Sequence, residues 1–223
     1  MKKALFLAGL LIMVSGCGRE IRTTGFLDRT AGVTALAKGA TVAVVENSQA
    51  ENPIFDREVK GKIEKLLARR GYRAAAAGKA DYILTYGYSI SPGLRSTPVT
   101  TYGPPQTQIT SVPDGKGGVT TRAITLPGQP TVVPMLSTEY TRRLMVTVAD
   151  AARQREDKKE HVLWVGETHS IDPSSDLRSD IDYLLVATFL YFGQDTGKQV
   201  RVNLSPNDPE VLELRSEAGA PAR

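Results

Sequence analysis

The chain has 223 residues, of which 41% are hydrophobic and 23% are charged. This composition excludes a mostly disordered or collagen-like chain, and the length fits one domain of about 100–200 residues with segments left over. The formal net charge is +4, or +2 without Lys2 and Lys3, which is too balanced for the concentrated basic face of a nucleic-acid-binding protein. We therefore expect no nucleic-acid partner.

The residues that usually carry catalysis or metal binding are scarce. The single cysteine excludes an intramolecular disulfide and a Cys-based zinc site. His161 and His169 fall on one expected strand, about 26 Å apart at roughly 3.3 Å per residue, so they cannot share a metal ion. The sequence contains no phosphate-binding glycine loop, no G-x-S-x-G and no H-E-x-x-H. We expect no catalytic residue, no metal and no cofactor.

The N-terminus has the features of a signal peptide. Lys2 and Lys3 precede the apolar run 4–14, which is shorter than the roughly 20 residues that span a membrane. The following residues, Val14-Ser15-Gly16-Cys17, resemble the lipobox of bacterial lipoproteins, with small residues before a cysteine. The alternative is a secreted protein that has Cys17 at this position by chance.

The lipobox resemblance implies that residues 1–16 are removed and that Cys17 becomes the first residue. It implies a thioether-linked diacylglycerol on Cys17 and usually an amide-linked acyl chain such as palmitate. Each buried methylene contributes about 0.8 kcal/mol, so two or three chains hold a protein firmly at a membrane. Gly18 stands where many Gram-negative bacteria place an inner-membrane retention Asp. We therefore expect an outer-membrane lipoprotein that faces the periplasm, with the inner membrane as the alternative.

The segment 17–39 is polar and glycine-containing, which is typical of a tether, although Ile21 to Leu27 is equally consistent with a short strand. A flexible tether of this length spans roughly 25–30 Å. The domain itself is expected at residues 40–204, and the remaining residues, 205–223, are expected to form a polar tail with at most a short helix.

A strand, a helix and a second strand are predicted in the first part of the domain. The β-branched run 41–46 predicts a buried strand. Asn52 and Pro53 are favourable residues for a helix start, and Gly71 is favourable for its end. One face of this helix is apolar and is expected in the core, whereas Lys62 is expected at the surface. Its apolar residues are Phe55, Val59, Ile63, Leu66 and Leu67.

A strand over 80–90 follows, with Tyr82, Tyr86 and Tyr88 on one face at a period of two residues. This face is expected to be core beneath a helix, and the alternative is a stacking platform for a sugar or a peptide. The segment 92–138 is rich in Pro and Thr and contains a turn at 113–118. It is expected to form an exposed hairpin inserted between core elements.

The second half is expected to pair two strands and to add a helix. Asp172, Asp176, Asp180 and Asp182 lie near the start of that helix, where they complement the helix dipole or, alternatively, bind a cation. Trp164 is expected in the core. The expected elements are a strand at 139–150, a charged hairpin tip at 153–160, a strand at 161–170, a helix from Pro173 with a Ser as its N-cap to Gly193, and an edge strand at 198–204.

Together these elements predict an α+β fold with a mixed, mainly antiparallel sheet and two helices packed on one face. Their sequence resembles a domain-of-unknown-function (DUF-type) family of small Gram-negative envelope lipoproteins. The resemblance covers roughly residues 40–193 and implies a lipid-anchored periplasmic domain without transferable catalytic residues. It rests on Asn52-Pro53, Leu66-Leu67, Gly71-Tyr72, Ala80-Asp81-Tyr82-Ile83-Leu84, Leu163-Trp164-Val165-Gly166, and the helix through Ile181 and Leu185 to Phe192-Gly193.

We expect a non-enzymatic protein that binds or scaffolds an envelope protein partner. The alternatives are an envelope hydrolase with an unrecognised site and an accessory factor for the assembly of lipid or outer-membrane proteins. The inserted segment is either a passive surface insert or the carrier of the partner contact. The second interpretation follows from its short runs around Ile109, which can extend a sheet edge. Tyr82, Tyr86 and Tyr88 are the next candidates for this contact.

Overall fold

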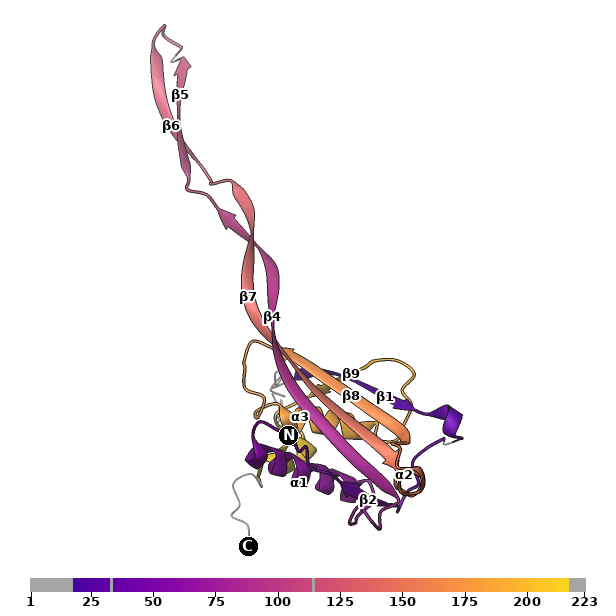
Figure 1. Cartoon of the computed structure of the whole chain (residues 1–223). Helices are drawn as coiled ribbons and strands as arrows, with labels where there is room; N and C mark the ends of the chain where they lie inside the picture. Colours follow the sequence, from indigo (N-terminus) through magenta and orange to yellow (C-terminus); the bar gives the residue numbers. More distant parts are fainter. Residues whose placement is uncertain (1–17, 33, 114, 217–223) are drawn as a thin grey trace, which may run out of the picture. The chain divides into compact units, whose positions relative to one another are not determined.

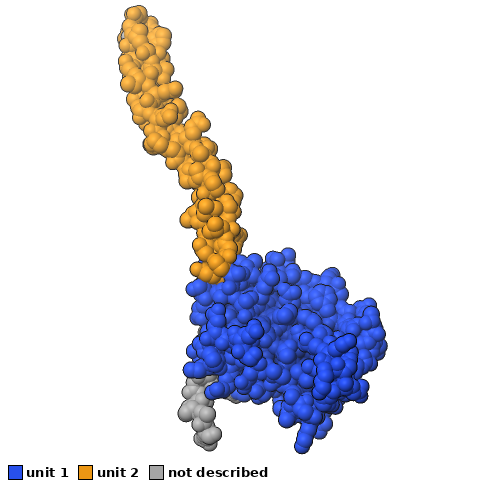
Figure 2. Space-filling model, viewed as in Figure 1, with its two compact units in different colours: residues 1–91, 141–223 blue, residues 92–140 orange. Residues whose placement is uncertain are grey.

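The computed structural model describes residues 18–32, 34–113 and 115–216. The expected signal peptide, the lipidation site Cys17 and the last residues of the polar tail lie outside the described residues. The chain divides into two compact units (Figure 2): unit 1 comprises residues up to Ser91 and from Thr141 onward, and unit 2 comprises Pro92–Tyr140.

Within the described residues, unit 1 is built on a seven-stranded sheet of order β3-β2-β4-β7-β8-β1-β9 (Figure 1). β2 is parallel to β3 and β4, whereas β1 is antiparallel to both β8 and β9. β4 begins in unit 1 and ends in unit 2, whereas β7 begins in unit 2 and ends in unit 1. The strands are β1 (Arg19–Leu27), β2 (Thr41–Val44), β3 (Arg73–Ala74), β4 (Tyr82–Tyr102), β7 (Pro130–Asp150), β8 (Val162–Asp172) and β9 (Val200–Leu204).

Three of the helices described in unit 1, α1, α3 and α4, pack against the sheet or against one another. α1 contacts α3, and α3 contacts α4, β1 and β8. This arrangement confirms the predicted α+β fold with a mixed, mostly antiparallel sheet. The helices are the short 3-10 turn η1 (Arg29–Ala31), α1 (Pro53–Arg69), α2 (Ala151–Asp157), α3 (Ile181–Leu190) and α4 (Pro209–Ser216).

The helix α1 forms where the sequence predicts it. The Asn52 side chain accepts hydrogen bonds from the backbone N–H groups of Ile54 and Phe55, which otherwise have no partner at a helix start. Val59 and Ile63 are fully buried, so the predicted apolar face is the core face. Gly71 follows the helix with a φ of 86°, in the left-handed region that glycine adopts most easily.

The helix α3 starts later than the sequence predicts. The side chain of Asp172 accepts a hydrogen bond from Ser174 N, and that of Asp176 accepts one from Ser179 N. Such short-range bonds stabilise turns in competition with a helix. The helix therefore begins at Ile181, and the predicted Ser N-cap is wrong. All of its residues except Leu190 are buried, which explains why its sequence is more continuously apolar than that of α1.

The structure also decides the remaining expectations for unit 1. Residues 19–27 form β1 between β8 and β9, so the strand alternative, rather than the tether, describes them. The expected hairpin tip at 153–160 is mainly the helix α2, because the Asp150 side chain caps the N–H groups of Ala152 and Arg153. The short helix allowed in the tail is α4, and its buried residues Val211 and Leu214 attach this part of the tail to the domain. The edge strand expected at 198–204 is confirmed as β9.

Unit 2 contains the predicted inserted hairpin. β5 (Gln106–Pro113) and β6 (Val119–Leu126) pair antiparallel, with Ile109 opposite Ala123. The turn between them contains Gly115 and Gly117, both with positive φ, a conformation that costs glycine little. Every residue of β5 and β6 is exposed.

Candidate functional site

The inserted hairpin of unit 2, which here means the whole segment 92–140, exposes many apolar side chains and few charges. Leu94, Tyr102 and Ile109 each expose at least 72% of their surface. The segment 92–140 has five charged residues among 49, whereas charge is what normally keeps such a surface solvated. Further exposed apolar residues on this segment are Val99, Val112, Val119, Ile124, Leu126, Val132, Val133, Met135 and Leu136.

The backbone of the hairpin is also available for pairing. β5 and β6 form a two-stranded sheet among the described residues, so each strand has a neighbour on one side only. The outer N–H and C=O groups of such a sheet can pair with another strand. A two-stranded hairpin alone is marginally stable in water, so a third strand would both satisfy these groups and cover apolar side chains.

The three candidate tyrosines lie in unit 1, whereas Ile109 lies in unit 2. Tyr86 is buried, and its hydroxyl donates a hydrogen bond to Asp56 Oδ2 at 2.9 Å. Burial, together with the Asp56 carboxylate, raises the pKa of Tyr86 well above its ordinary value. Tyr86 is therefore part of the core and its hydroxyl is held neutral.

Tyr82 and Tyr88 are half-buried beside this core. The Tyr82 hydroxyl accepts a hydrogen bond from Ala37 N at 3.2 Å. Tyr88 contacts the ring of Phe55 edge to face, with 5.2 Å between ring centroids. Burial and the nearby Asp56 raise the pKa of Tyr88 to about 12. These contacts are typical of tyrosines at the margin of a core and leave only part of each ring accessible.

A second candidate site is a buried charge cluster next to α3. Arg142 is fully buried, and its Nη1 lies 2.7 Å from Oδ2 of Asp180, which is also buried. Arg142 further lies 3.6 Å from Asp172 Oδ1 and donates to the Ser174 carbonyl. Arg19 of β1 forms another ion pair with Asp180. Burial, and then the neighbouring Arg19, lower the pKa of Arg142, while the carboxylate of Asp172 opposes this shift.

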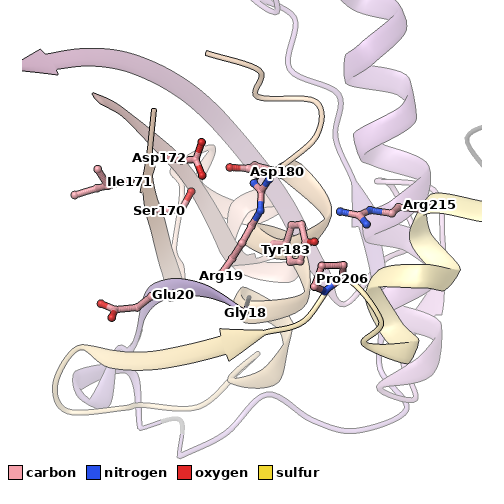
Figure 3. A pocket seen from close by; sticks show the side chains of 10 residues that line it. All are labelled: Gly18, Arg19, Glu20, Ser170, Ile171, Asp172, Asp180, Tyr183, Pro206 and Arg215. Atoms are coloured by element: carbon pink, nitrogen blue, oxygen red, sulfur yellow. Dashed lines mark ion pairs between the residues drawn. The ribbon is translucent and has the colours of Figure 1, made fainter. Parts of the chain in front are cut away.

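This cluster borders a cavity of about 610 Å³ (Figure 3). The ring of Tyr183 lies between two guanidinium groups, with Cζ of Arg19 at 4.9 Å and Cζ of Arg215 at 4.8 Å from its centroid. Ser170 also lines the cavity, and its buried Oγ has no hydrogen-bond partner within the described residues. The cavity thus presents both charge signs and an available hydroxyl.

None of the expectations from the sequence includes this cavity, although the sequence contains one signal for it. Arg142 is an even number of residues from the apolar positions of its strand, so it falls on the same predicted inward face. These positions are Tyr140, Leu144, Val146 and Val148. An arginine at a buried position of a strand requires carboxylate partners. Asp172 and Asp180 serve as those partners, so an account of them through the helix dipole alone is incomplete.

A third charge cluster corrects the expectation for Lys62. This residue is 6% exposed, and its Nζ lies 2.8 Å from Glu58 Oε1 and 2.7 Å from Asp182 Oδ1. Glu58 also contacts Arg178 at 2.5 Å. Burial tends to raise the pKa of Glu58, but Lys62 and Arg178 outweigh it and lower this pKa. The prediction of a surface position for Lys62 is therefore wrong.

The histidines have separate surroundings. His161 Nε2 lies 2.6 Å from Asp157 Oδ2 at the end of α2, whereas His169 is half-buried on β8. Burial, and then the charge of Arg22, lower the pKa of His169. No group of three potential metal ligands occurs among the residues that the structure describes. In the same part of the chain, none of the helices combines the length and apolar character that crossing a membrane requires.

No known family model and no curated protein matches the sequence. Among solved structures, the chain is similar to a PDZ domain protein from Parabacteroides distasonis, with 15% identity and a TM-score of 0.47. That match covers 83% of this chain but 39% of the other. Two PelC dodecamer structures from Paraburkholderia phytofirmans have 15% and 13% identity, cover 79% of this chain and 99% of theirs, and have TM-scores of 0.38. Similarities this distant identify no function for this chain.

Proposed function

We propose that this protein is a non-enzymatic envelope lipoprotein, held at the outer membrane through Cys17, that binds an envelope protein partner by strand addition to the hairpin of unit 2. The lipobox resemblance supports the anchor, and Gly18 after Cys17 supports the outer membrane. The observation that carries the binding function is the hairpin itself. It combines exposed apolar side chains, few charges and a sheet of two strands with open edges.

The chemistry of strand addition fits the residues of this hairpin. The partner would contribute an extended segment whose backbone pairs with an outer edge of β5 or β6, and alternate side chains of that segment would contact Ile109 and its apolar neighbours. The β-branched residues Thr, Ile and Val are frequent in both strands. They favour the extended conformation that such pairing needs.

The binding function is tested by deleting the hairpin from the anchored protein. Residues 95–136 are replaced by a short Gly-Ser linker, and both forms are cross-linked in intact envelopes and recovered. Unit 1 has its own core in Val59, Ile63 and Leu184, so its melting temperature should change little. Recovery of the partner should be lost. Unchanged recovery with a folded deletion protein would contradict the proposal and place the partner contact on unit 1.

The anchor is tested separately by mass spectrometry of the mature N-terminus. We expect a chain that begins at Cys17 and carries the mass of a diacylglycerol, and we expect Cys17→Ser to abolish this modification. An unmodified mature chain that begins at another residue would contradict the anchor without bearing on the hairpin.

A further inference from the structure

The cavity beside Tyr183 in unit 1 has chemistry that the binding of a protein partner to the hairpin does not use. Its polar lining is charged with both signs: Arg19 and Arg215 are basic, whereas Glu20, Asp172 and Asp180 are acidic. Figure 3 shows Asp172 and Arg215 toward opposite ends of the lining side chains. A ligand that carries a cation and an anion a few bonds apart would complement both ends.

The acidic end offers a carboxylate oxygen of Asp172 as an acceptor for a ligand. Within the described residues, Asp172 contacts Ser174 N at 2.8 Å and Arg142 at 3.6 Å, and both contacts use Oδ1. Its Oδ2 can therefore accept from a ligand, and the side chain is 33% exposed. The nearby Oγ of Ser170 is buried without a hydrogen-bond partner within the described residues. A buried hydroxyl without a partner is costly, and a ligand in the cavity would relieve that cost.

The basic end offers guanidinium N–H donors to a ligand. A guanidinium has five N–H donors. Arg215 has a carboxylate at 3.8 Å, in Asp182, and its side chain is 36% exposed. Arg19 is 32% exposed. Guanidinium groups bind phosphate well because their forked donors match its oxygens. The anionic part of the ligand is therefore best matched by a phosphate group.

The type of cation follows from Tyr183. Quaternary ammonium groups bind to open aromatic faces, but Arg19 and Arg215 already lie against this ring at 4.9 and 4.8 Å from its centroid. A primary ammonium instead needs hydrogen-bond acceptors, which Asp172 Oδ2 and Ser170 Oγ provide. The cavity thus favours ethanolamine over choline.

The position of the cavity identifies the source of such a group. Gly18 lines the cavity and is bonded to Cys17, so a lipid on Cys17 would place the cavity at the membrane surface. We propose that this cavity binds the phosphoethanolamine headgroup of a membrane phospholipid, with phosphate at Arg215 and Arg19 and ammonium at Asp172. The assignment to a lipid rests on the proposed anchor, whereas the headgroup chemistry rests on the cavity alone.

The headgroup chemistry is tested with the full chain carrying Cys17→Ser, which removes the anchor, by NMR titration with soluble probes. Glycerophosphoethanolamine should bind with a Kd on the order of 1 mM, as expected for a small polar ligand. It should bind at least tenfold more tightly than glycerophosphocholine or glycerol phosphate. Equal affinity for the three probes, or no saturable binding, would overturn the proposal.

Two variants and a matched control assign the ends of the cavity. Asp172→Asn should bring the affinity ratio of glycerophosphoethanolamine to glycerol phosphate close to one, and a ratio measured in one sample does not depend on its folded fraction. Arg215→Gln should weaken both probes at least fivefold. Glu167→Gln, an exposed position on the same strand, should change neither by more than twofold. An unchanged ratio in Asp172→Asn would overturn the ammonium assignment.

The source of the headgroup is tested with the lipidated protein in vesicles. In phosphatidylethanolamine vesicles, but not in phosphatidylcholine vesicles, the amide signals of Ser170 and Tyr183 should shift as they do with the soluble probe. Soluble binding without this shift would make free phosphoethanolamine compounds the ligand and overturn the lipid assignment. Failure of lipidation at Cys17, detected by mass spectrometry, would contradict the proposed anchor while leaving the result with soluble probes intact.

Discussion

Replacement of Lys62 by Ala should destabilise unit 1 far more than the same change at Lys60, two residues earlier on α1. Lys62 is 6% exposed and lies within 2.8 Å of two carboxylates, on Glu58 and Asp182. Removing one partner of a buried ion pair costs about 3–5 kcal/mol, because a charge is left without compensation. Glu58 keeps Arg178, and Asp182 keeps Arg215 at 3.8 Å, so we expect about 3 kcal/mol.

Lys60 provides the matched control. Its Nζ lies 3.0 Å from Glu46, whose side chain is 55% exposed, and surface pairs of this kind contribute about 0–1 kcal/mol. In urea unfolding we expect a clearly lower midpoint for Lys62→Ala and almost no change for Lys60→Ala. The loss corresponds to roughly 6–12 °C in melting temperature for a domain of this size.

A third variant separates charge from packing. Lys62→Met keeps most of the apolar stem and removes the ammonium group, so it should lose most of the same stability. If the free energies of unfolding of Lys62→Ala and Lys60→Ala agree to within about 0.5 kcal/mol, which is the range for ordinary surface sites, the buried network does not stabilise unit 1.

Three further predictions concern α1. Ile63→Ala should cost about 2–5 kcal/mol in urea unfolding, because Ile63 is fully buried; a cost below about 1 kcal/mol would argue against this core. Asn52→Ala should lower the free energy of unfolding by about 1 kcal/mol through loss of the cap. Asn52→Gly should lower it by only a few tenths of a kcal/mol. The folded-state pKa of Glu58 is lowered from 4.5, so its contribution is present above pH 4.5 and is lost as pH falls through the lowered pKa. The urea midpoint of the parent should therefore fall more steeply in that window than that of Glu58→Gln, and parallel curves would contradict this assignment.

The sequence predicted the elements whose signals are local. The cap at Asn52, the glycine at 71 and the apolar spacing between them suffice to place α1. The Pro-Asp-Gly turn and the alternating residues around it suffice to place the exposed hairpin. In each case neighbouring residues determine the backbone conformation, so no knowledge of distant contacts is needed.

The elements that were missed depend on contacts between distant parts of the chain. Lys62 is buried because Asp182, which is 120 residues away, faces it, and no periodicity within α1 indicates that partner. Arg142 requires Asp180, which lies at the N-cap of α3. The start of α3 was misplaced because side-chain turns at 172–179 imitate the residues of a helix start.

The candidate sites divide in the same way. Ile109 was proposed as a contact from the alternation within its own segment, and it is 72% exposed on β5. The cavity beside Tyr183 is assembled from β1, β8, α3 and α4, so no single segment of sequence contains its signature.

The central claim, that the hairpin binds the partner, is tested most directly by site-specific photo-cross-linking in intact envelopes. A photoreactive phenylalanine is placed at Ile109, which is 72% exposed on β5, or at Ile54, which is 76% exposed on α1 in unit 1. Because the two positions are similarly exposed isoleucines, they differ chiefly in the unit that carries them. We predict a discrete cross-linked product with a protein partner from Ile109 and none from Ile54. The same product from Ile54 alone, or none from Ile109 in a protein that is folded and anchored, would contradict the claim.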